Sequence, residues 1–230
     1  MRKFFKSILP PFLINFYRDI YIKFLIYKNR KLVSSDYQDI DIYDTDLTAE
    51  KLSEWGEGTT WNEIKMLFIS QEGKVLDLAC GVGKNMRDIN KINPNLDVYG
   101  CDISQNLIDI CIKSGLDKKK LICCDATKIN FDQNFFDYSY SIGSLEHFTE
   151  KGLDDVIGKL HFITKKLSIH MMPVSKKNLN EGWIKTYQTF HNNKVDWWVN
   201  KFNKKFSKVY VIDSAWEDHI SVGKWFVCYK

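Results

Sequence analysis

The sequence has few cysteines and no long uncharged apolar run, and both absences narrow the class of protein. Its 6 cysteines among 230 residues show neither CxxC spacing nor a cluster with histidine, so neither a disulfide scaffold nor a metal site is expected. The uncharged stretch Ser7 to Tyr17 is shorter than the ~20 residues of a transmembrane helix. Pro10-Pro11 and the later charges also interrupt any signal peptide. We expect reduced core thiols in a cytoplasmic protein at Cys80, Cys101, Cys123, Cys124 and Cys228.

An excess of one charge is also lacking over most of the chain. There are 33 Lys and Arg against 29 Asp and Glu, and residues 1–31 carry eight of the basic side chains against a single acidic one. The rest of the chain is therefore slightly acidic and shows no basic stripe, which predicts no nucleic-acid partner. With 44% hydrophobic and 14% aromatic residues, the chain can bury a large core.

The N-terminal arm, residues 1–31, combines its basic charge with a helix predicted over residues 12–28. Apolar residues recur there at every fourth position, at Phe12, Phe16, Ile20 and Phe24. Three partners stay open for this stripe: its own domain, a second copy of the chain in a homodimer, or the inner face of a membrane touched peripherally. An acidic connector follows, so we assign residues 1–50 to the arm and connector and residues 51–230 to the main domain.

From residue 74 onward, short apolar runs alternate with helical patterns, which is typical of βαβ units and a parallel sheet. Strands are expected over residues 74–79, 97–101, 120–124, 135–140 and 167–171, and helices over residues 48–55, 60–69, 84–92, 105–114 and 149–165. A polar, Trp-rich insertion spans about residues 173–200. Two final strands, 206–212 and 222–229, are close enough to pair antiparallel across the turn-like segment 214–221.

The first predicted strand ends in an acidic residue and a glycine-containing turn. Asp77 is followed by Ala79, Gly81 and Gly83, where small side chains let the backbone approach a ligand closely. The spacing is neither GxGxxG nor GxxxxGK[ST], so it requires neither a dinucleotide pyrophosphate nor a phosphate loop.

Acidic residues also end the next two predicted strands. Asp102 can accept hydrogen bonds from ribose hydroxyls, and Asp125 can accept one from an adenine amino group beside the small Ala126. Asp77 and Asp102 could instead cap the helices that follow them. Capping alone does not explain why three successive strands end in acids, so we predict one ligand-binding crevice.

These motifs make residues 75–148 resemble a class I S-adenosylmethionine-dependent methyltransferase of the small-molecule type. In that resemblance Asp77 to Gly83 match the glycine-rich motif with Ala79 in place of its first glycine, Asp102 is the ribose-binding acid, and Ile103 packs on adenine. Asp125-Ala126 match the adenine contact, and Ser141 belongs to the motif at the fourth strand. The family implies S-adenosylmethionine as cofactor and a Rossmann-like α/β fold with helices on both faces. Its seven strands have the order 3-2-1-4-5-7-6, with strand 7 antiparallel.

Three histidines are candidates for a general base if the acceptor is a hydroxyl. His147 follows the fourth strand beside Glu146, in a loop that the family places near the methyl group, so it ranks first. His191 in the insertion and His170 in the fifth strand are the alternatives. Glu146 can orient His147 or contact the cofactor.

The acceptor is expected to be a small polar molecule bound by the insertion. Its aromatic and amide side chains suit a sugar or nucleotide-sugar of surface polysaccharide biosynthesis; they are Trp183, Tyr187, Phe190, His191, Asn192, Asn193, Trp197 and Trp198. The same aromatic residues could instead only cover the sheet edge. The alternatives are a membrane-associated lipid or quinone methyltransferase and a non-catalytic nucleoside-binding module.

Overall fold

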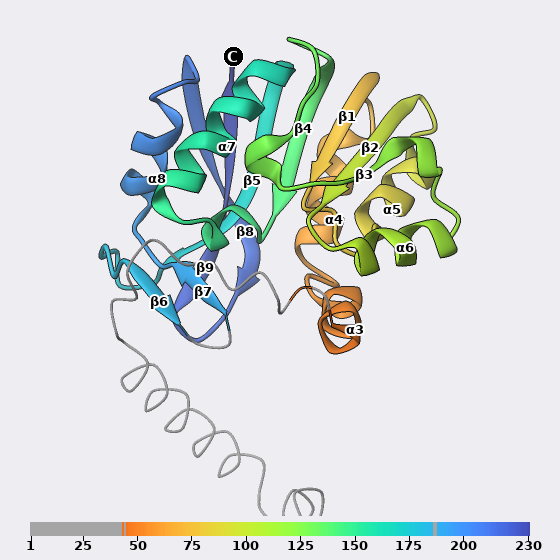
Figure 1. The fold of residues 1–230 in the computed structure, drawn as a ribbon. Helices are drawn as coiled ribbons and strands as arrows, with labels where there is room; N and C mark the ends of the chain where they lie inside the picture. The colour runs from red at the N-terminus through yellow and green to blue at the C-terminus, as the bar shows by residue number, and fades with distance from the viewer. Residues whose placement is uncertain (1–42, 44, 186–187) are drawn as a thin grey trace, which may run out of the picture.

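A computed structural model describes residues 43, 45–185 and 188–230 and shows one seven-stranded sheet (Figure 1). The strand order is β3-β2-β1-β4-β5-β9-β8. The sheet strands are β1 (Gly73–Leu78), β2 (Leu96–Asp102), β3 (Leu121–Cys123), β4 (Phe136–Ile142), β5 (Thr164–Ser175), β8 (Lys208–Glu217) and β9 (Ser221–Tyr229). Neighbouring strands from β3 to β5 pair in parallel, and β9 runs antiparallel to both β5 and β8. The predicted Rossmann-like topology is confirmed.

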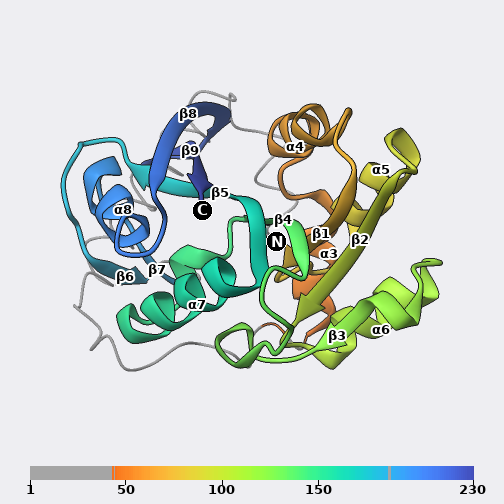
Figure 2. The same ribbon diagram turned by 90° about the horizontal axis from the view of Figure 1, so that it is seen from above.

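Helices cover both faces of the sheet because successive strand residues point to opposite sides. Val75 packs in one core with α4 (Thr60–Phe68), α5 (Lys84–Ile92) and α6 (Gln105–Lys113). Leu76 packs in the other core with α7 (Glu150–Ile163) and α8 (Val195–Phe202). Figure 2 shows α4 and α7 on opposite sides of the sheet. The remaining helix, α3 (Asp46–Glu54), lies beyond the carboxyl edge of the parallel strands (Figure 1).

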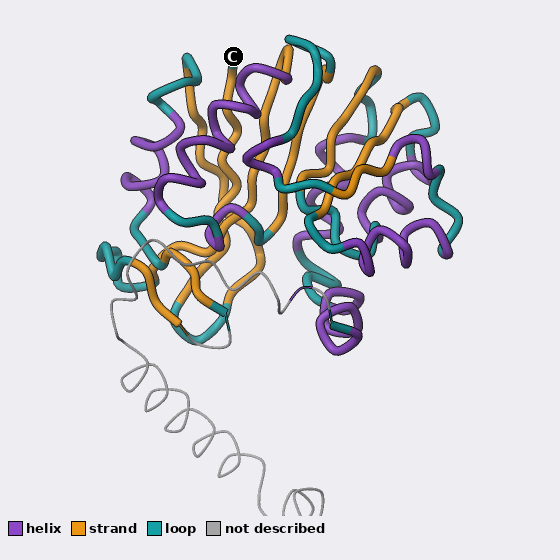
Figure 3. Tube along the Cα trace, viewed as in Figure 1, coloured by secondary structure: helices purple, strands orange, loops and turns teal. Residues whose placement is uncertain are grey.

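The segment between β5 and β8 is more regular than the sequence pattern indicates. It contains a small antiparallel hairpin of β6 (Trp183–Lys185) and β7 (Thr189–His191), followed by α8 (Figure 3). β5 continues past the predicted end to Ser175, and β8 continues through part of the predicted turn to Glu217 with a register shift after Asp213. The hairpin and α3 therefore frame the same edge of the sheet (Figure 1).

The prediction for the N-terminal arm is not tested by the described part of the chain. The basic arm and its helix lie outside the described residues. Among the described helices, none combines the length and the apolar character that crossing a bilayer requires.

Cys80, Cys101 and Cys228 are buried free thiols as expected, and Cys124 is half-buried. The expectation for Cys123 is wrong, because its short strand β3 forms the edge of the sheet and leaves the side chain exposed.

Candidate active site

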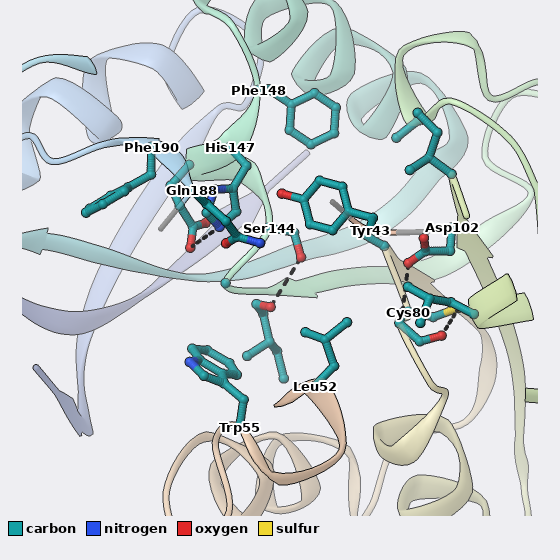
Figure 4. A pocket seen from close by; sticks show the side chains of 18 of the residues that line it. Tyr43, Leu52, Trp55, Cys80, Asp102, Ser144, His147, Phe148, Gln188 and Phe190 are labelled. Atoms are coloured by element: carbon teal, nitrogen blue, oxygen red, sulfur yellow. Dashed lines mark hydrogen bonds and ion pairs between the residues drawn. The ribbon is translucent and has the colours of Figure 1, made fainter. Parts of the chain in front are cut away.

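A cavity of about 880 Å³ opens at the carboxyl ends of β1, β2 and β4. This volume is near the upper end for pockets that hold a drug-sized ligand. Figure 4 shows its side chains projecting inward from several elements. Eight of the predicted site residues line it: Ala79, Gly81, Asp102, Ile103, Asp125, Ala126, Glu146 and His147. One pocket therefore joins most of the predicted cofactor positions to the predicted catalytic pair.

Asp102 organises the turn after β1. Its Oδ2 accepts a hydrogen bond from the Gly81 N–H at 2.8 Å, and its Oδ1 accepts one from the Ser104 N–H at 3.0 Å. Burial raises the pKa of Asp102, and these backbone donors oppose the rise. Gly81 has a φ of 54°, a left-handed conformation that favours glycine. Each Asp102 oxygen keeps acceptor capacity toward the pocket, as a pair of ribose hydroxyls requires.

Asp125 caps a short turn and also lines the cavity. Its Oδ1 accepts from the Thr127 N–H at 2.9 Å and from the Thr127 hydroxyl at 2.7 Å. Burial acts to raise the pKa of Asp125, but the Thr127 hydrogen bonds and nearby Lys128 outweigh it and the pKa is lowered. Ala126 begins the short 3-10 turn η3 (Ala126–Lys128) and lines the cavity. A charged acceptor and a small side chain thus lie together at this end.

Four predicted site residues do not line the cavity: Asp77, Gly83, Ser141 and His191. Asp77 accepts a hydrogen bond from the Tyr140 hydroxyl at 2.8 Å within the sheet. Gly83, at φ 69°, begins α5, and a Cβ there would lie 2.5 Å from Leu116 and 2.8 Å from the Cys111 sulfur. Glycine at position 83 thus allows a tight turn and close packing against Cys111 and Leu116. Direct contact between Gly83 and the cofactor stays a prediction.

The other two lie in buried packing around α8. Ser141 is hydrogen-bonded to Nδ1 of His170 at 2.8 Å, and Ser168 is hydrogen-bonded to Nε2 of the same ring at 2.7 Å. Both nitrogens of His170 are therefore engaged, and its side chain is fully buried. His191 packs among Trp183, Trp197 and Trp198, also away from the cavity. Its catalytic role stays a prediction.

Glu146 and His147 follow β4 in the turn η4 (Leu145–His147) and face the cavity. Nδ1 of His147 lies 2.8 Å from the backbone oxygen of Thr189 in β7. A carbonyl oxygen only accepts, so Nδ1 carries the ring hydrogen and donates a hydrogen bond to it. Nε2 is then the basic nitrogen, 3.7 Å from Oε1 of Glu146. Oε2 of Glu146 has no hydrogen-bond partner among the described residues.

Burial makes both members of this pair neutral near pH 7. It lowers the pKa of His147 to about 4, against the opposing effect of the Thr189 carbonyl. It also raises the pKa of Glu146 to about 8. The contact is therefore not an ion pair at neutral pH, and His147 presents an unprotonated Nε2. No group of three or more His, Cys, Asp or Glu side chains arranged for a metal ion occurs in the described part of the chain.

Several cavity residues come from segments outside the sequence motifs. Tyr43 lies with its ring centroid 6.4 Å from that of His147 (Figure 4). Trp55 follows α3, Trp216 belongs to β8, and His219 lies in the turn before β9. Of the aromatic and amide residues predicted for the acceptor, only Phe190 lines the cavity, and Tyr187 is outside the described residues. The aromatic character of Tyr43, Trp55 and Trp216 was the one signal in the sequence that could have identified them as cavity residues.

Comparison with known proteins agrees with this geometry. A family model described as a methyltransferase domain, Methyltransf_25, matches residues 75–166. The structure of phosphoethanolamine N-methyltransferase 2 from Haemonchus contortus in complex with S-adenosyl-L-methionine is similar with a TM-score of 0.64 and 16% identity, over 87% of this chain and 60% of that one. Residues 75–166 therefore form a methyltransferase domain, which supports the predicted class I S-adenosylmethionine-dependent family and its cofactor. The predicted fold is confirmed.

Curated relatives match this chain over only part of their length. The tRNA (carboxymethyluridine(34)-5-O)-methyltransferase alkbh8 of Xenopus tropicalis is 36% identical over 39% of this chain and 14% of its own length. The ubiquinone/menaquinone biosynthesis C-methyltransferase UbiE of Burkholderia mallei is 27% identical over 57% of this chain and 55% of its own length. The chain thus spans less than two thirds of the length of either relative.

The buried Asp77 predicts how stability depends on pH. Burial raises the pKa of Asp77 from its ordinary 3.8 to about 8, the Tyr140 hydroxyl opposes this, and Asp102 adds to it. The folded protein then holds a proton that the unfolded chain releases, so the free energy of unfolding falls as pH rises from about 4 to about 8. Asp77→Asn removes this dependence and should raise the melting temperature more at pH 8 than at pH 5. The exposed Asp132→Asn is the control, and an equal change at both pH values would contradict the assignment.

Proposed function

We propose that this methyltransferase transfers a methyl group to a hydroxyl of a small-molecule acceptor. The observation that supports this most is the single cavity that holds Asp102 and Gly81 on one side and His147 and Glu146 on the other. A nucleoside-sized ligand on the first group leaves the second group facing the remaining space. Alignment in an enclosed site supplies much of the rate of such a transfer.

The residues present suit the cofactor. Asp102 and the Gly81 turn would hold its ribose, Ile103 and Ala126 would flank adenine, and Asp125 would accept from the adenine amino group. When bound, S-adenosylmethionine supplies an electrophilic methyl group on a sulfonium. The buried carboxylate of Asp102 beside a left-handed glycine turn provides a cradle for this ligand without a long side chain in the way.

His147 is placed to remove the acceptor proton. Its Nε2 is unprotonated at neutral pH, and the Thr189 carbonyl fixes the ring orientation through Nδ1. A neutral Glu146 can donate a hydrogen bond from Oε2, which has no partner among the described residues. The pair therefore offers an acceptor hydroxyl one proton acceptor and one hydrogen-bond donor.

The identity of the acceptor stays a prediction. Two relatives are named for tRNA and for ubiquinone/menaquinone biosynthesis, and neither name refers to a polysaccharide. Asn192 donates to Glu181 at 2.6 Å, and Asn193 accepts from the Gly182 N–H at 2.9 Å, so two amides expected to bind a sugar serve the hairpin instead. The acidic body still argues against RNA. Cytoplasmic location and membrane contact through residues 1–31 are also proposals, which vesicle flotation of the full chain can examine.

A transfer assay tests the proposed function. The full chain is incubated with methyl-labelled S-adenosylmethionine and fractionated small-molecule, lipid and RNA extracts. We expect label in a small molecule that carries a hydroxyl group. Label confined to RNA or lipid would contradict the acceptor class, and binding of the cofactor without any transfer would favour the non-catalytic nucleoside-binding alternative.

A further inference from the structure

Two tryptophans from distant parts of the chain meet in the lining of the cavity. The ring centroids of Trp55 and Trp216 are 5.8 Å apart, with the planes inclined by 46°. A Cβ on Gly143 would lie 2.7 Å from Cη2 of Trp55, so the indole packs directly on the residue that follows β4. The same loop continues to Glu146 and His147. Both indoles line the same cavity as Glu146 and His147.

A carboxylate on α4 holds Trp216 in this position. Glu63 accepts hydrogen bonds from the Ser214 hydroxyl at 2.7 Å, from the Ala215 N–H at 2.6 Å and from Nε1 of Trp225 at 2.6 Å. The Ser214 hydroxyl in turn accepts from the Trp216 N–H at 3.2 Å. These bonds fix the part of β8 where its register with β9 shifts. Glu63 is outside the cavity lining, so it is a positioning residue for Trp216.

The cavity that the tryptophan pair lines has many apolar and aromatic side chains beside its polar ones, which include Asn85, Ser144, Asp155, Asp218 and His219. Leu52, Trp61, Ile142, Pro173 and Phe190 line the cavity as well. Within the β6–β7 hairpin and its loop, Gln188 is the amide side chain that lines the cavity. The amides of Asn192 and Asn193 are instead hydrogen-bonded within the hairpin. A sugar needs several hydrogen-bond partners, whereas a planar ring gains most from aromatic contact.

We propose that Trp55 and Trp216 form the acceptor subsite and that it takes a planar, uncharged ring bearing a hydroxyl group. This inference rests on the proposed function for the direction of the hydroxyl toward His147. The ring stacks on the indoles while the hydroxyl reaches Nε2 of His147. Methyl-ammonium acceptors are the rival class for an aromatic wall. Asp155 and Asp218 also line the cavity, so a cationic probe is included in the test.

Three probes of different chemistry test the subsite. Catechol represents a planar hydroxylated ring, methyl glucoside a sugar, and tetramethylammonium a cation. Each is titrated by saturation-transfer NMR into the full chain, with and without S-adenosylhomocysteine. We expect catechol to bind and the other two not to displace it. Binding of methyl glucoside or tetramethylammonium in place of catechol, or no catechol binding at millimolar concentration, would overturn the proposal.

Variants locate the catechol site. Trp216→Ala should weaken catechol binding about five- to tenfold, as expected for the loss of one aromatic contact, and Trp216→Phe should retain most of it. Glu63→Gln should weaken catechol binding while S-adenosylhomocysteine affinity is unchanged. Tyr210→Ala is the matched control, since Tyr210 is an exposed aromatic residue of the same strand outside the cavity. Equal catechol affinity in Trp216→Ala and Tyr210→Ala would overturn the assignment. Absence of S-adenosylhomocysteine binding would count against the proposed function. The catechol titration performed without S-adenosylhomocysteine would still test the subsite.

Discussion

Replacing His147 by alanine is expected to lower turnover by about 10²–10⁴-fold and to leave cofactor affinity nearly intact. The reason is that His147 lines the cavity and Nε2 is its unprotonated nitrogen, whereas Nδ1 is hydrogen-bonded to Thr189. The measurement is the initial rate with the acceptor found in the transfer assay, together with calorimetry of S-adenosylhomocysteine. Because burial lowers the pKa of His147 to about 4, the wild-type rate should persist below pH 6 and fall as pH approaches 4.

Three other histidines make this result interpretable. His161→Ala is the control, since His161 lies outside the cavity and contacts Phe206. His191→Ala should have a smaller effect than His147→Ala, because its ring is enclosed by tryptophans. A larger loss in His219→Ala would move the base to the turn before β9, since His219 lines the cavity too. If no single change slows the reaction more than a few-fold, the general-base hypothesis is wrong and alignment alone carries catalysis.

Asp102→Ala should weaken S-adenosylhomocysteine binding by about 1.5–3 kcal/mol, the loss expected for hydrogen bonds to a charged acceptor. The change also removes the partner of the Gly81 N–H and so loosens the turn against which the ribose would lie. Asp102→Asn keeps an acceptor oxygen but loses the charge, and its affinity should fall between those of wild type and Asp102→Ala. Calorimetry gives all three values.

The control for this series is Asp109→Ala, which removes an exposed carboxylate of α6 that does not line the cavity. Its affinity should equal that of wild type. A folded Asp102→Ala protein with unchanged affinity would refute the ribose assignment. Circular dichroism and the melting temperature establish folding independently of the ligand.

Local sequence patterns were sufficient for the sheet and for the cofactor side of the cavity. Apolar runs ending in Asp102 and Asp125 define strands, and parallel strands bring their carboxyl ends to one edge. The glycine turn after β1 forms where the pattern predicts it. These features depend on residues that are neighbours in sequence or end consecutive strands, so a single sequence carries them.

Contacts between distant segments were not predictable in the same way. Tyr140 donates a hydrogen bond to Asp77 across 63 residues, and Asp77 does not line the cavity. Glu63 contacts β8 across about 150 residues and thereby sets Trp216 in the cavity. Pro173 interrupts the pattern of a strand because it lacks an N–H, yet β5 continues through it opposite Gly223. Such pairings depend on the assembled sheet, which sequence periodicity does not specify.

Calorimetric titration of the full wild-type chain with S-adenosylhomocysteine tests the central claim most directly. The cavity at the ends of β1, β2 and β4 predicts saturable binding at one site per chain with an affinity in the micromolar range, and S-adenosylmethionine should compete for it. Adenosine should bind more weakly, since it lacks the amino-acid portion of the ligand. No saturable heat with S-adenosylhomocysteine at millimolar concentration, from a chain that melts cooperatively, would contradict the account.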